Sequence, residues 1–451
     1  MSHSSFSSQL SRSSFACILA GMILLSLPRD LSAAVISGNV VDAQGNAMGG
    51  VMVSAFDEQQ RKFISVFSKT DGSFVIDDLR DADHALRARL MGQQDVWIDD
   101  VEVGSNEIAI QMQRATGEGL EEQRPASSGF SMLKFDNTAD KLNFKMMCSY
   151  CHQIGTIGFR TPEKPVDWET MIRRMDGFGG LYRHTQETIV QRLVETYKDD
   201  AVTRWPEFVP PPAPTGTAAK AKITAWEIDK RGEGAFHDLE LGSDGLVYAV
   251  NISRHYLVTL SPETSEKKFY KMPRRSYGPH SIELDNNDDM WITMCATGQM
   301  VKFDTETHEF TVCSSAEAPA KRGSYPHTLR INPRDKEGLI WYTDAGRNSC
   351  FSLHPSSLNV KEYRLLRAHQ AVAAGKGESR GITPYGLDYS PVDGMIWYSK
   401  LNGNRIGRID PSKSDGDIRE WNPPFRGPRR LHVAADGMVW VPGFASGVFA
   451  R

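Results

Sequence analysis

The stretch "MMCSYCHQIG", residues 146–155, contains two cysteines and a histidine whose spacing could hold a cofactor. Cys148 and Cys151 are separated by two residues, and His152 follows the second cysteine directly. Three chemistries use closely spaced cysteines: a zinc site, a redox-active thiol pair, and the covalent attachment of a c-type haem. The surrounding sequence has to distinguish among them.

The context favours haem attachment. A structural zinc site needs four nitrogen or sulfur ligands, and the chain has no second CxxC pair. A thioredoxin-like thiol pair would accompany a βαβ pattern, whereas the flanking segments are predicted to be helical. A histidine directly after the second cysteine is typical of covalent haem c. We therefore expect one haem, joined to Cys148 and Cys151 through thioethers, with His152 as the proximal iron ligand.

Three helices are expected around this motif, over residues 132–203. One should begin near Thr138, a second should carry Trp168, Met171 and Met175 on one face at i, i+3 and i+7, and a third should span residues 185–200. A domain of this size would gain stability from a large bound cofactor.

The second helix suggests the remaining iron ligand. Its sequence "WETMIRRMDG" resembles the mini cytochrome c domains found beside quinohaemoprotein amine dehydrogenases. The resemblance implies that Met175 is the distal ligand. Met171 is the alternative, followed by His184 or by no protein ligand, and either methionine could instead simply fill the core beside Trp168. Histidine–methionine ligation would raise the reduction potential, as suits electron transfer.

The N-terminus predicts export. Polar residues with Arg12 precede the apolar run "SFACILAGMILLSL" and the small residues before Val35, the order of a secretory signal over residues 1–34. We expect a periplasmic or secreted protein that does not span the membrane after cleavage. The net charge of −4 and the lack of a polybasic cluster argue against a nucleic-acid partner.

Residues 35–112 predict a small antiparallel β-sandwich, because short alternating segments are separated by Gly- and Asn-containing turns. The segments "GNVVDAQG" and "TDGSFVIDDL" resemble the carboxypeptidase regulatory-like, transthyretin-like domain, which implies an accessory module. Two linkers are expected: the polar residues 113–131 and the Pro-rich residues 204–221.

Residues 222–451 contain an internal repeat that predicts a β-propeller. Each copy holds four short strands with a Gly or Asp turn before a tryptophan- or tyrosine-containing strand, and four full copies and part of a fifth are visible. "GMIWYSKLNGNRIGRIDP" and "LIWYTDAGRNS" resemble the virginiamycin B (streptogramin) lyase family. The resemblance implies a propeller of seven blades and a lyase that opens a cyclic depsipeptide with a metal and a histidine base.

The repeat places histidines at equivalent positions. His237, His280 and His327 start the expected innermost strand of three successive copies, and Tyr385 and Arg430 are taken as the matching residues of the next two. Because innermost strands line the channel of a propeller, the three imidazoles could converge on a divalent metal or a substrate anion. They are the candidate catalytic residues. The alternative is structural, with each histidine bonded to a neighbouring repeat.

Together these patterns predict a mainly β, multidomain protein with a small all-α cytochrome c domain between a sandwich and a propeller. We expect an exported mono-haem c-type cytochrome that transfers electrons with a periplasmic redox partner, a dehydrogenase or another cytochrome. The propeller would serve as a docking platform or an associated oxidoreductase site. The alternative is a metal-dependent lyase or hydrolase in the propeller with an accessory haem, so the sequence leaves open whether the chain is an enzyme.

Overall fold

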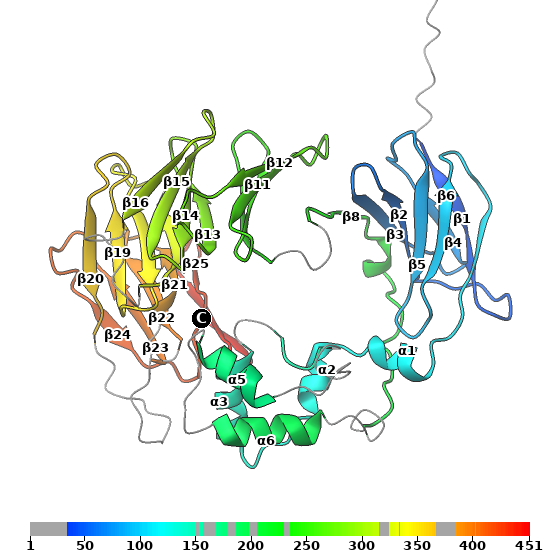
Figure 1. Cartoon of the computed structure of the whole chain (residues 1–451), viewed down its shortest axis with the longest axis horizontal. Coiled ribbons are helices and arrows are strands. Elements are labelled where there is room, and N and C mark those ends of the chain that lie inside the picture. Colours follow the sequence, from blue (N-terminus) through cyan, green and yellow to red (C-terminus); the bar gives the residue numbers. More distant parts are fainter. Residues whose placement is uncertain are drawn as a thin grey trace, which may run out of the picture.

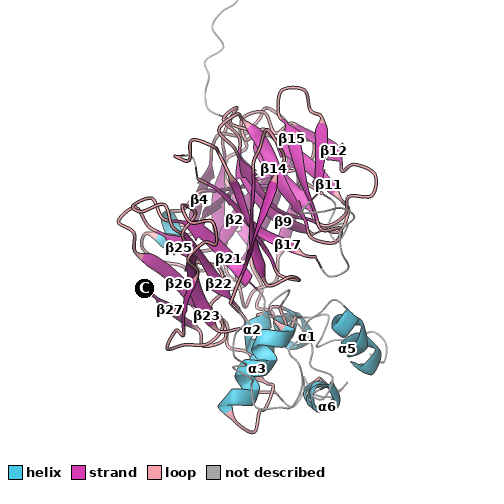
Figure 2. Cartoon of the chain, turned by 90° about the vertical axis from the view of Figure 1, so that its left-hand side faces the viewer, coloured by secondary structure: helices cyan, strands magenta, loops and turns pink. Residues whose placement is uncertain are grey.

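The computed structural model describes residues 34–149, 153–156, 168–177, 186–197, 205–229, 235–314, 324–332, 334–366, 384–401 and 403–451. They form a β-sandwich, a group of helices and a fan of five sheets (Figure 1). The predicted mainly β, multidomain architecture is confirmed, and Figure 2 shows the helices gathered at one end of the strands. Residues 1–33 of the expected signal segment lie outside the described residues.

The sandwich consists of two sheets, with strand orders β4-β1-β7 and β6-β5-β2-β3-β8. β1 pairs antiparallel with β4 and parallel with β7. Side chains alternate between the core and the outer face, as in β5, because successive residues of a strand point to opposite sides. Seven of these strands are β1 (Ile36–Val41), β2 (Met52–Asp57), β3 (Lys62–Phe67), β4 (Ser73–Ile76), β5 (His84–Arg89), β6 (Val96–Val101) and β7 (Ile108–Gln111).

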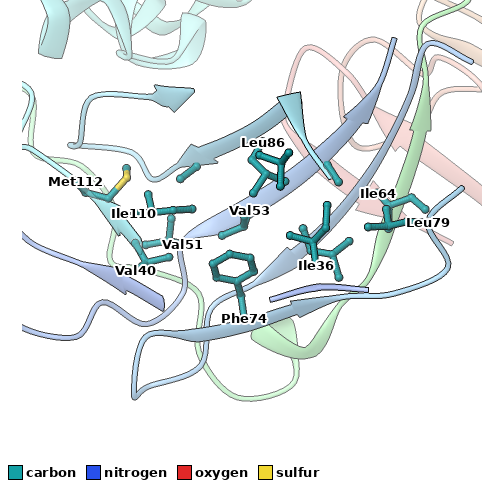
Figure 3. Packing of buried hydrophobic residues seen from close by; sticks show 14 residues of the cluster. Ile36, Val40, Val51, Val53, Ile64, Phe74, Leu79, Leu86, Ile110 and Met112 are labelled. Carbon is teal, nitrogen blue, oxygen red and sulfur yellow. The ribbon is translucent and has the colours of Figure 1, made fainter. Parts of the chain in front are cut away.

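The core of the sandwich lies between its two sheets. Figure 3 shows the ring of Phe74 from β4 directed at Val53 of β2, with Ile36, Val40 and Leu86 around them. All five side chains are almost fully buried. Burying each of these side chains stabilises the fold by roughly 1.5–3 kcal/mol. The sandwich therefore has a hydrophobic core made of its own residues.

The helices are α1 (Gly117–Glu122), α2 (Ala126–Ser131), α3 (Thr138–Cys148), α5 (Trp168–Gly177) and α6 (Gln186–Thr196). The predicted start of a helix near Thr138 is confirmed: the Asn137 side chain accepts a hydrogen bond of 2.9 Å from the backbone N–H of Asp140, which caps α3. Among the described helices, none is long and apolar enough to cross a bilayer.

The first expected linker, residues 113–131, is instead largely helical, because it forms α1 and α2. Arg124, between these helices, is buried and makes a bidentate ion pair with Glu121. Its guanidinium also donates to the carbonyl oxygen of Pro206, 2.7 Å away, and lies against the rings of Trp205 and Phe208. A buried guanidinium needs such partners, so the segment is fixed in place.

The second expected linker, residues 204–221, also packs on the sandwich side of the molecule. Phe208 is buried with Ala115 and Leu120, and a one-turn helix follows at Ala218–Lys220. The chain then forms β8 (Ile223–Trp226), which pairs with β3 of the sandwich. β8 lies inside the range 222–451 expected for the propeller, so the first propeller strand is β9 instead.

Five sheets form the fan, and we call them blades 1 to 5. Blades 1 to 4 have four strands each, and blade 5 has three among the described residues, as the repeat predicted. Blade 1 consists of β9 (Phe236–Leu241), β10 (Val247–Asn251), β11 (Tyr256–Leu260) and β12 (Lys267–Lys271). Blade 2 consists of β13 (Pro279–Leu284), β14 (Asp289–Met294), β15 (Gln299–Asp304) and β16 (Phe310–Ser314).

Blades 3 to 5 repeat the antiparallel order. Blade 3 consists of β17 (Pro326–Ile331), β18 (Ile340–Asp344), β19 (Ser349–Leu353) and β20 (Val360–Arg364). Blade 4 consists of β21 (Pro384–Tyr389), β22 (Ile396–Lys400), β23 (Arg405–Ile409) and β24 (Arg419–Trp421), and blade 5 of β25 (His432–Val433), β26 (Val439–Gly443) and β27 (Val448–Ala450).

The innermost strands β9, β13, β17, β21 and β25 lie beside one another in that order. Tryptophans of the second strands fill the space between blades: Trp291 of blade 2 packs with blade 3, and Trp341 of blade 3 packs with blade 4. This packing fixes the innermost strands, and therefore the side chains that face the axis, at defined positions.

Candidate functional sites

The end of α3 places Cys148 in an apolar cluster. The cluster joins Phe144 of α3 to Trp168 and Met171 of α5 and to Leu193 of α6, and Cys148 packs against it, partly buried. Burial raises the pKa of the Cys148 thiol to about 12, so the thiol stays protonated at neutral pH. Cys151 and His152 lie outside the described residues.

The candidate distal ligands lie on or near α5. Met171 is partly buried against the same cluster as Cys148, and Met175 lies one turn further along the helix. The side chain of Met175 and the whole of His184 are outside the described residues. The helix therefore brings Met171 to the same apolar cluster as Cys148, whereas the choice between the two methionines stays a prediction.

The three predicted histidines do come together, as neighbours in a series of rings from successive blades around the axis, each ring tilted by 36–50° against the next. Ring centroids are 3.6 Å apart for His237 and His280, 4.2 Å for His280 and His327, and 4.1 Å for His327 and Tyr385. The guanidinium of Arg429 extends the stack, because its Nη2 donates to the Tyr385 hydroxyl over 2.9 Å. We call these five side chains the axial ring stack.

The hydrogen bonds between blades explain why His237 is a histidine. The Thr293 hydroxyl of blade 2 donates to the His327 carbonyl of blade 3, and the Thr343 hydroxyl of blade 3 donates to the Tyr385 carbonyl of blade 4. Blade 1 has Val250 at this position, which has no donor. Instead the His237 Nδ1 lies 2.7 Å from the carbonyl oxygen of His280. A carbonyl only accepts, so Nδ1 carries the proton and Nε2 keeps its lone pair.

The same kind of hydrogen bond corrects the predicted match between Arg430 of blade 5 and Tyr385 of blade 4. The Ser399 hydroxyl of blade 4 donates to the carbonyl of Arg429, just as Thr343 does to that of Tyr385. Arg429 rather than Arg430 is therefore the blade 5 counterpart of Tyr385. The proline that directly precedes this position in blades 2 to 5, Pro428 in blade 5, was the sequence signal that could have identified Arg429.

The histidines of the stack are neutral at pH 7. Burial lowers the pKa values of His280 and His327 well below the usual range, and the partial removal of the His237 ring from water by its neighbours lowers its pKa as well. His280 and His327 are only 3% and 4% exposed, whereas the side chain of His237 reaches solvent. Within the described part of the chain, no group of three or more His, Cys, Asp or Glu side chains is arranged to hold a metal.

The axial ring stack is linked to α3 by a short series of contacts. The Arg429 guanidinium carbon lies 4.7 Å from the centroid of the Phe444 ring. The Lys145 ammonium of α3 lies 5.7 Å from the same centroid. Lys145 precedes Cys148 by three residues, so the helix that ends at the CxxCH motif contacts Phe444 of blade 5, which in turn contacts Arg429 of the axial ring stack.

A second set of axial residues escaped the sequence analysis. Each lies three positions after a member of the ring stack and opposite an aromatic residue of the second strand, as in the pairs Glu240 with Tyr248 and Glu283 with Trp291. The fixed offset of three residues was the signal that could have revealed them. We call this set the charged ring: Glu240, Glu283, Arg330, Asp388 and His432.

Contacts around the charged ring join four of its five members. Arg330 lies 3.3 Å from Glu283 and 3.8 Å from Asp388, and His432 lies 2.9 Å from Asp388. Glu240 has no cationic side chain within ion-pair distance among the described residues. Burial raises the pKa of Glu240 and raises the pKa of Glu283 to about 8, with the neighbouring Glu240 adding to the second effect.

The charged ring lines a cavity of about 450 Å³, which we call the channel cavity. Asp238 and Arg430 also reach it, as an ion pair with 4.0 Å between the nearest atoms. Its lining also includes the apolar residues Leu239, Ile282, Leu284 and Ile331 of the innermost strands, of which Ile282 and Ile331 are nearly fully buried between blades. A volume of this order suits a small organic molecule.

Comparison with known proteins gives weak likenesses for the second half of the chain. The chain is 16% identical to virginiamycin B lyase from Staphylococcus aureus, with a TM-score of 0.40, covering 49% of this chain and 70% of that one. For a streptogramin B lyase structure the values are 19%, 0.42, 51% and 69%. For regucalcin, a calcium-binding protein from Agrobacterium tumefaciens, they are 16%, 0.33, 48% and 69%. The assignment of propeller blades rests on the strand pairing of the chain itself.

The first half gives a match by sequence. A comparison with curated proteins gave no match. Residues 35–113 match the model of the carboxypeptidase regulatory-like domain, which confirms the family predicted for the N-terminal sandwich.

Proposed function

We propose that the chain is an exported mono-haem c-type cytochrome. Cys148 and Cys151 would attach the haem, His152 would be the proximal iron ligand, and Met175 of α5 would be the distal one. When bound, the haem would supply reversible one-electron chemistry for exchange with a periplasmic dehydrogenase or cytochrome. The observation that carries the proposal is the position of Cys148, at the end of a capped helix and in an apolar cluster shared with Trp168 and Met171.

The surroundings of Cys148 fit an attached haem better than the other two cysteine chemistries. Zinc ligands and redox-active thiols act as thiolates and need a lowered pKa. Burial does the opposite to Cys148, whose pKa is raised to about 12. A thiol held neutral against aromatic and aliphatic side chains is instead suited to becoming a thioether beside a large apolar ring.

The helices supply the groups that would position and shield the haem. Trp168, Ile172 and Leu193 are nearly fully buried, so this cluster excludes water. Tyr197, at the end of α6, donates a hydrogen bond of 3.0 Å to the carbonyl of Gly129 and so ties α6 to α2. Exclusion of water and a methionine ligand both favour a raised reduction potential.

The decisive experiment is a pyridine haemochrome assay on periplasmic protein made with a competent c-type maturation system. We expect one covalent haem per chain in the wild type and loss of covalent attachment in Cys148→Ala with Cys151→Ala. Cys313→Ala, which changes a buried cysteine of blade 2, should retain the haem. Colourless wild-type protein with the mass of the bare polypeptide would refute the proposal.

The distal ligand has its own test. Met175→Ala should abolish the methionine-to-iron charge-transfer band of the oxidised protein and lower its reduction potential. Met171→Ala is the matched control and should keep the band. Loss of the band in Met171→Ala alone would assign the ligand to Met171, and retention in both would favour His184 or an open position.

A second candidate function, lyase or hydrolase chemistry in the propeller, is favoured by the geometry of His237. Its Nδ1 is held by the His280 carbonyl, its side chain is exposed, and its lowered pKa keeps Nε2 unprotonated, which is how a general base is prepared. Turnover of a cyclic lactone-bearing peptide, with and without divalent metal, tests it. His237→Ala should lose turnover and His308→Asn, at an exposed turn of blade 2, should keep it; wild-type inactivity would remove this candidate.

A further inference from the structure

The charged ring has an unbalanced end. Four of its members alternate between acidic and basic groups around the axis, and each contacts its neighbour: Glu283, Arg330, Asp388 and His432. Glu240 precedes them, so two acidic residues stand next to each other on β9 and β13 with no described cationic side chain between them. Alternation predicts a positive charge at this place.

One oxygen of the Glu283 carboxyl group also lacks a hydrogen-bond donor. Its Oε2 is buried and has no hydrogen-bond partner among the described residues, although its Oε1 faces Arg330. A buried carboxylate oxygen without a donor is costly, so the group needs either a proton or a cation beside it. The raised pKa values of Glu240 and Glu283 are the expected response when no cation is supplied, because the carboxyl groups then hold their protons more tightly.

We propose that the channel cavity binds an organic cation, a primary ammonium on a short aliphatic chain, with the ammonium between Glu240 and Glu283. The aliphatic part would lie against Leu239 and Leu284, which line the same cavity and are at least partly exposed. The two arginines of the cavity do not oppose this placement, because Arg330 is engaged by Glu283 and Asp388, and Arg430 by Asp238.

Binding and proton release are linked at this site. At neutral pH Glu283 holds a proton, and a neighbouring ammonium favours its ionised form. The charged groups that face Glu283 are Glu240, Arg330 and Asp388, from three of the four other innermost strands. The amine should therefore displace a proton and bind more tightly as the pH rises from 6 to about 8.5.

The test is isothermal titration calorimetry of the full chain with n-hexylamine hydrochloride, in two buffers of different ionisation enthalpy. n-Hexanol is the neutral probe of the same length, and Ca²⁺ is the metal probe. We expect saturable binding of hexylamine with net proton release near pH 7, and much weaker binding of hexanol and Ca²⁺. Equal binding of hexanol, tighter binding of Ca²⁺, or no binding of the amine would each overturn the proposal.

Variants locate the site. Glu283→Gln and Glu240→Gln keep the size of the side chain and should weaken hexylamine at least about tenfold, and Glu283→Gln should abolish proton release. Glu309→Gln, at an exposed position of blade 2, should bind as the wild type does. Thermal unfolding checks that each variant is folded. The pH dependence of the wild type requires no variant, so it tests the proposal even if one variant fails to fold. Neither the binding of hexylamine nor its pH dependence requires an attached haem.

Discussion

His237 shows how one side chain can replace the function of another in a repeat. In blades 2, 3 and 4 a hydroxyl on the second strand donates to the carbonyl of the next innermost strand. Blade 1 has Val250 there, and the imidazole of His237 donates instead. The histidine therefore has a structural role between blades, whether or not its Nε2 also does chemistry.

A hydroxyl introduced at residue 250 of blade 1 should compensate for loss of the His237 imidazole. His237→Ala removes the donor to the His280 carbonyl, and we expect the free energy of unfolding to fall by about 1 kcal/mol. Adding Val250→Thr should recover most of that loss, because threonine occupies this position in blades 2 and 3. Chemical denaturation of the two variants and the wild type provides the measurement. If the double variant is less stable than His237→Ala, the equivalence of the two donors is wrong.

The buried carboxyl of Glu283 should make stability depend on pH. Its pKa is about 8 in the folded protein and 4.5 in an ordinary environment, so folding takes up a proton between these values. Its contribution to stability is complete below about pH 4.5 and is lost as the pH rises through 8, by up to about 1.4 kcal/mol per pH unit.

Unfolding by urea at a series of pH values measures this slope. Glu283→Gln cannot titrate, and its unfolding free energy should vary less between pH 5 and 8 than that of the wild type. The exposed Glu309→Gln should keep the wild-type slope. Identical slopes in the wild type and in Glu283→Gln would show that this carboxyl titrates normally.

At the residue level, the sequence predicted the histidine positions but not their arrangement. Equivalent positions in repeats fold to equivalent places, so His237, His280 and His327 had to meet near the axis. Whether they would surround a point or form a stack depends on side-chain rotamers and on hydrogen bonds between blades, which the repeat pattern does not contain. The charged ring was missed because its members, such as Glu283 and Arg330, share a position and not a residue type.

The innermost strands are the elements that set the geometry of the axis, and blades 4 and 5 approach each other most closely at Gly386. A Cβ built at this residue would lie 2.6 Å from the Arg429 carbonyl oxygen and 2.8 Å from the Cα of Arg430. Both atoms belong to backbone, which cannot rotate away. Glycine is therefore required where β21 meets the segment that leads into β25.

Gly386→Ala should force these two segments apart. We expect a loss of about 1–3 kcal/mol in unfolding free energy, the usual cost of overpacking, together with a weakened contact between Arg429 and Tyr385. Gly119→Ala is the control, since no atom lies within 4 Å of the added methyl group and alanine favours the helix α1. Amide hydrogen exchange should localise the change to blades 4 and 5; faster exchange in other blades only would contradict this explanation.

Among the elements, the helices α3, α5 and α6 and the blade strands could be predicted from periodicity, whereas the short helices α1 and α2 and the strand β8 were not predicted. Its sequence Ile223–Trp226 is short and follows a Pro-rich spacer, which made it seem the first strand of the repeat. Its pairing with β3 is a long-range contact, and the ion pair of Arg61 with Glu227 supports it. Local patterns carry no information about such a partner.

At the scale of the whole molecule, β8 enlarges the sandwich beyond its family boundary. The match to the carboxypeptidase regulatory-like domain covers residues 35–113, but β3 is an edge strand without β8. The propeller also contacts this part, because Lys267 of β12 donates to the Gln60 carbonyl over 2.8 Å. An uncovered edge strand is prone to pairing between molecules.

A fragment of residues 34–229 should therefore self-associate less than a fragment of residues 34–113. We expect the longer fragment to be monomeric by size-exclusion chromatography, with slow hydrogen exchange in β3. The shorter fragment should self-associate or show faster exchange in β3, since the β8 partner is missing. Equal behaviour of the two fragments would mean that β8 contributes little to the sandwich.

The path of the chain also determines whether the two fragments stay associated after a single proteolytic cleavage. The chain leaves the sandwich after β7 of one sheet, forms the helices, and returns at β8 to the other sheet of the sandwich. A single proteolytic break between α5 and α6 would leave one piece ending in the helices and the other beginning before β8. Hydrogen bonds from β3 to β8 would keep the two pieces together, so the cleaved protein should migrate as one species until denaturant separates it.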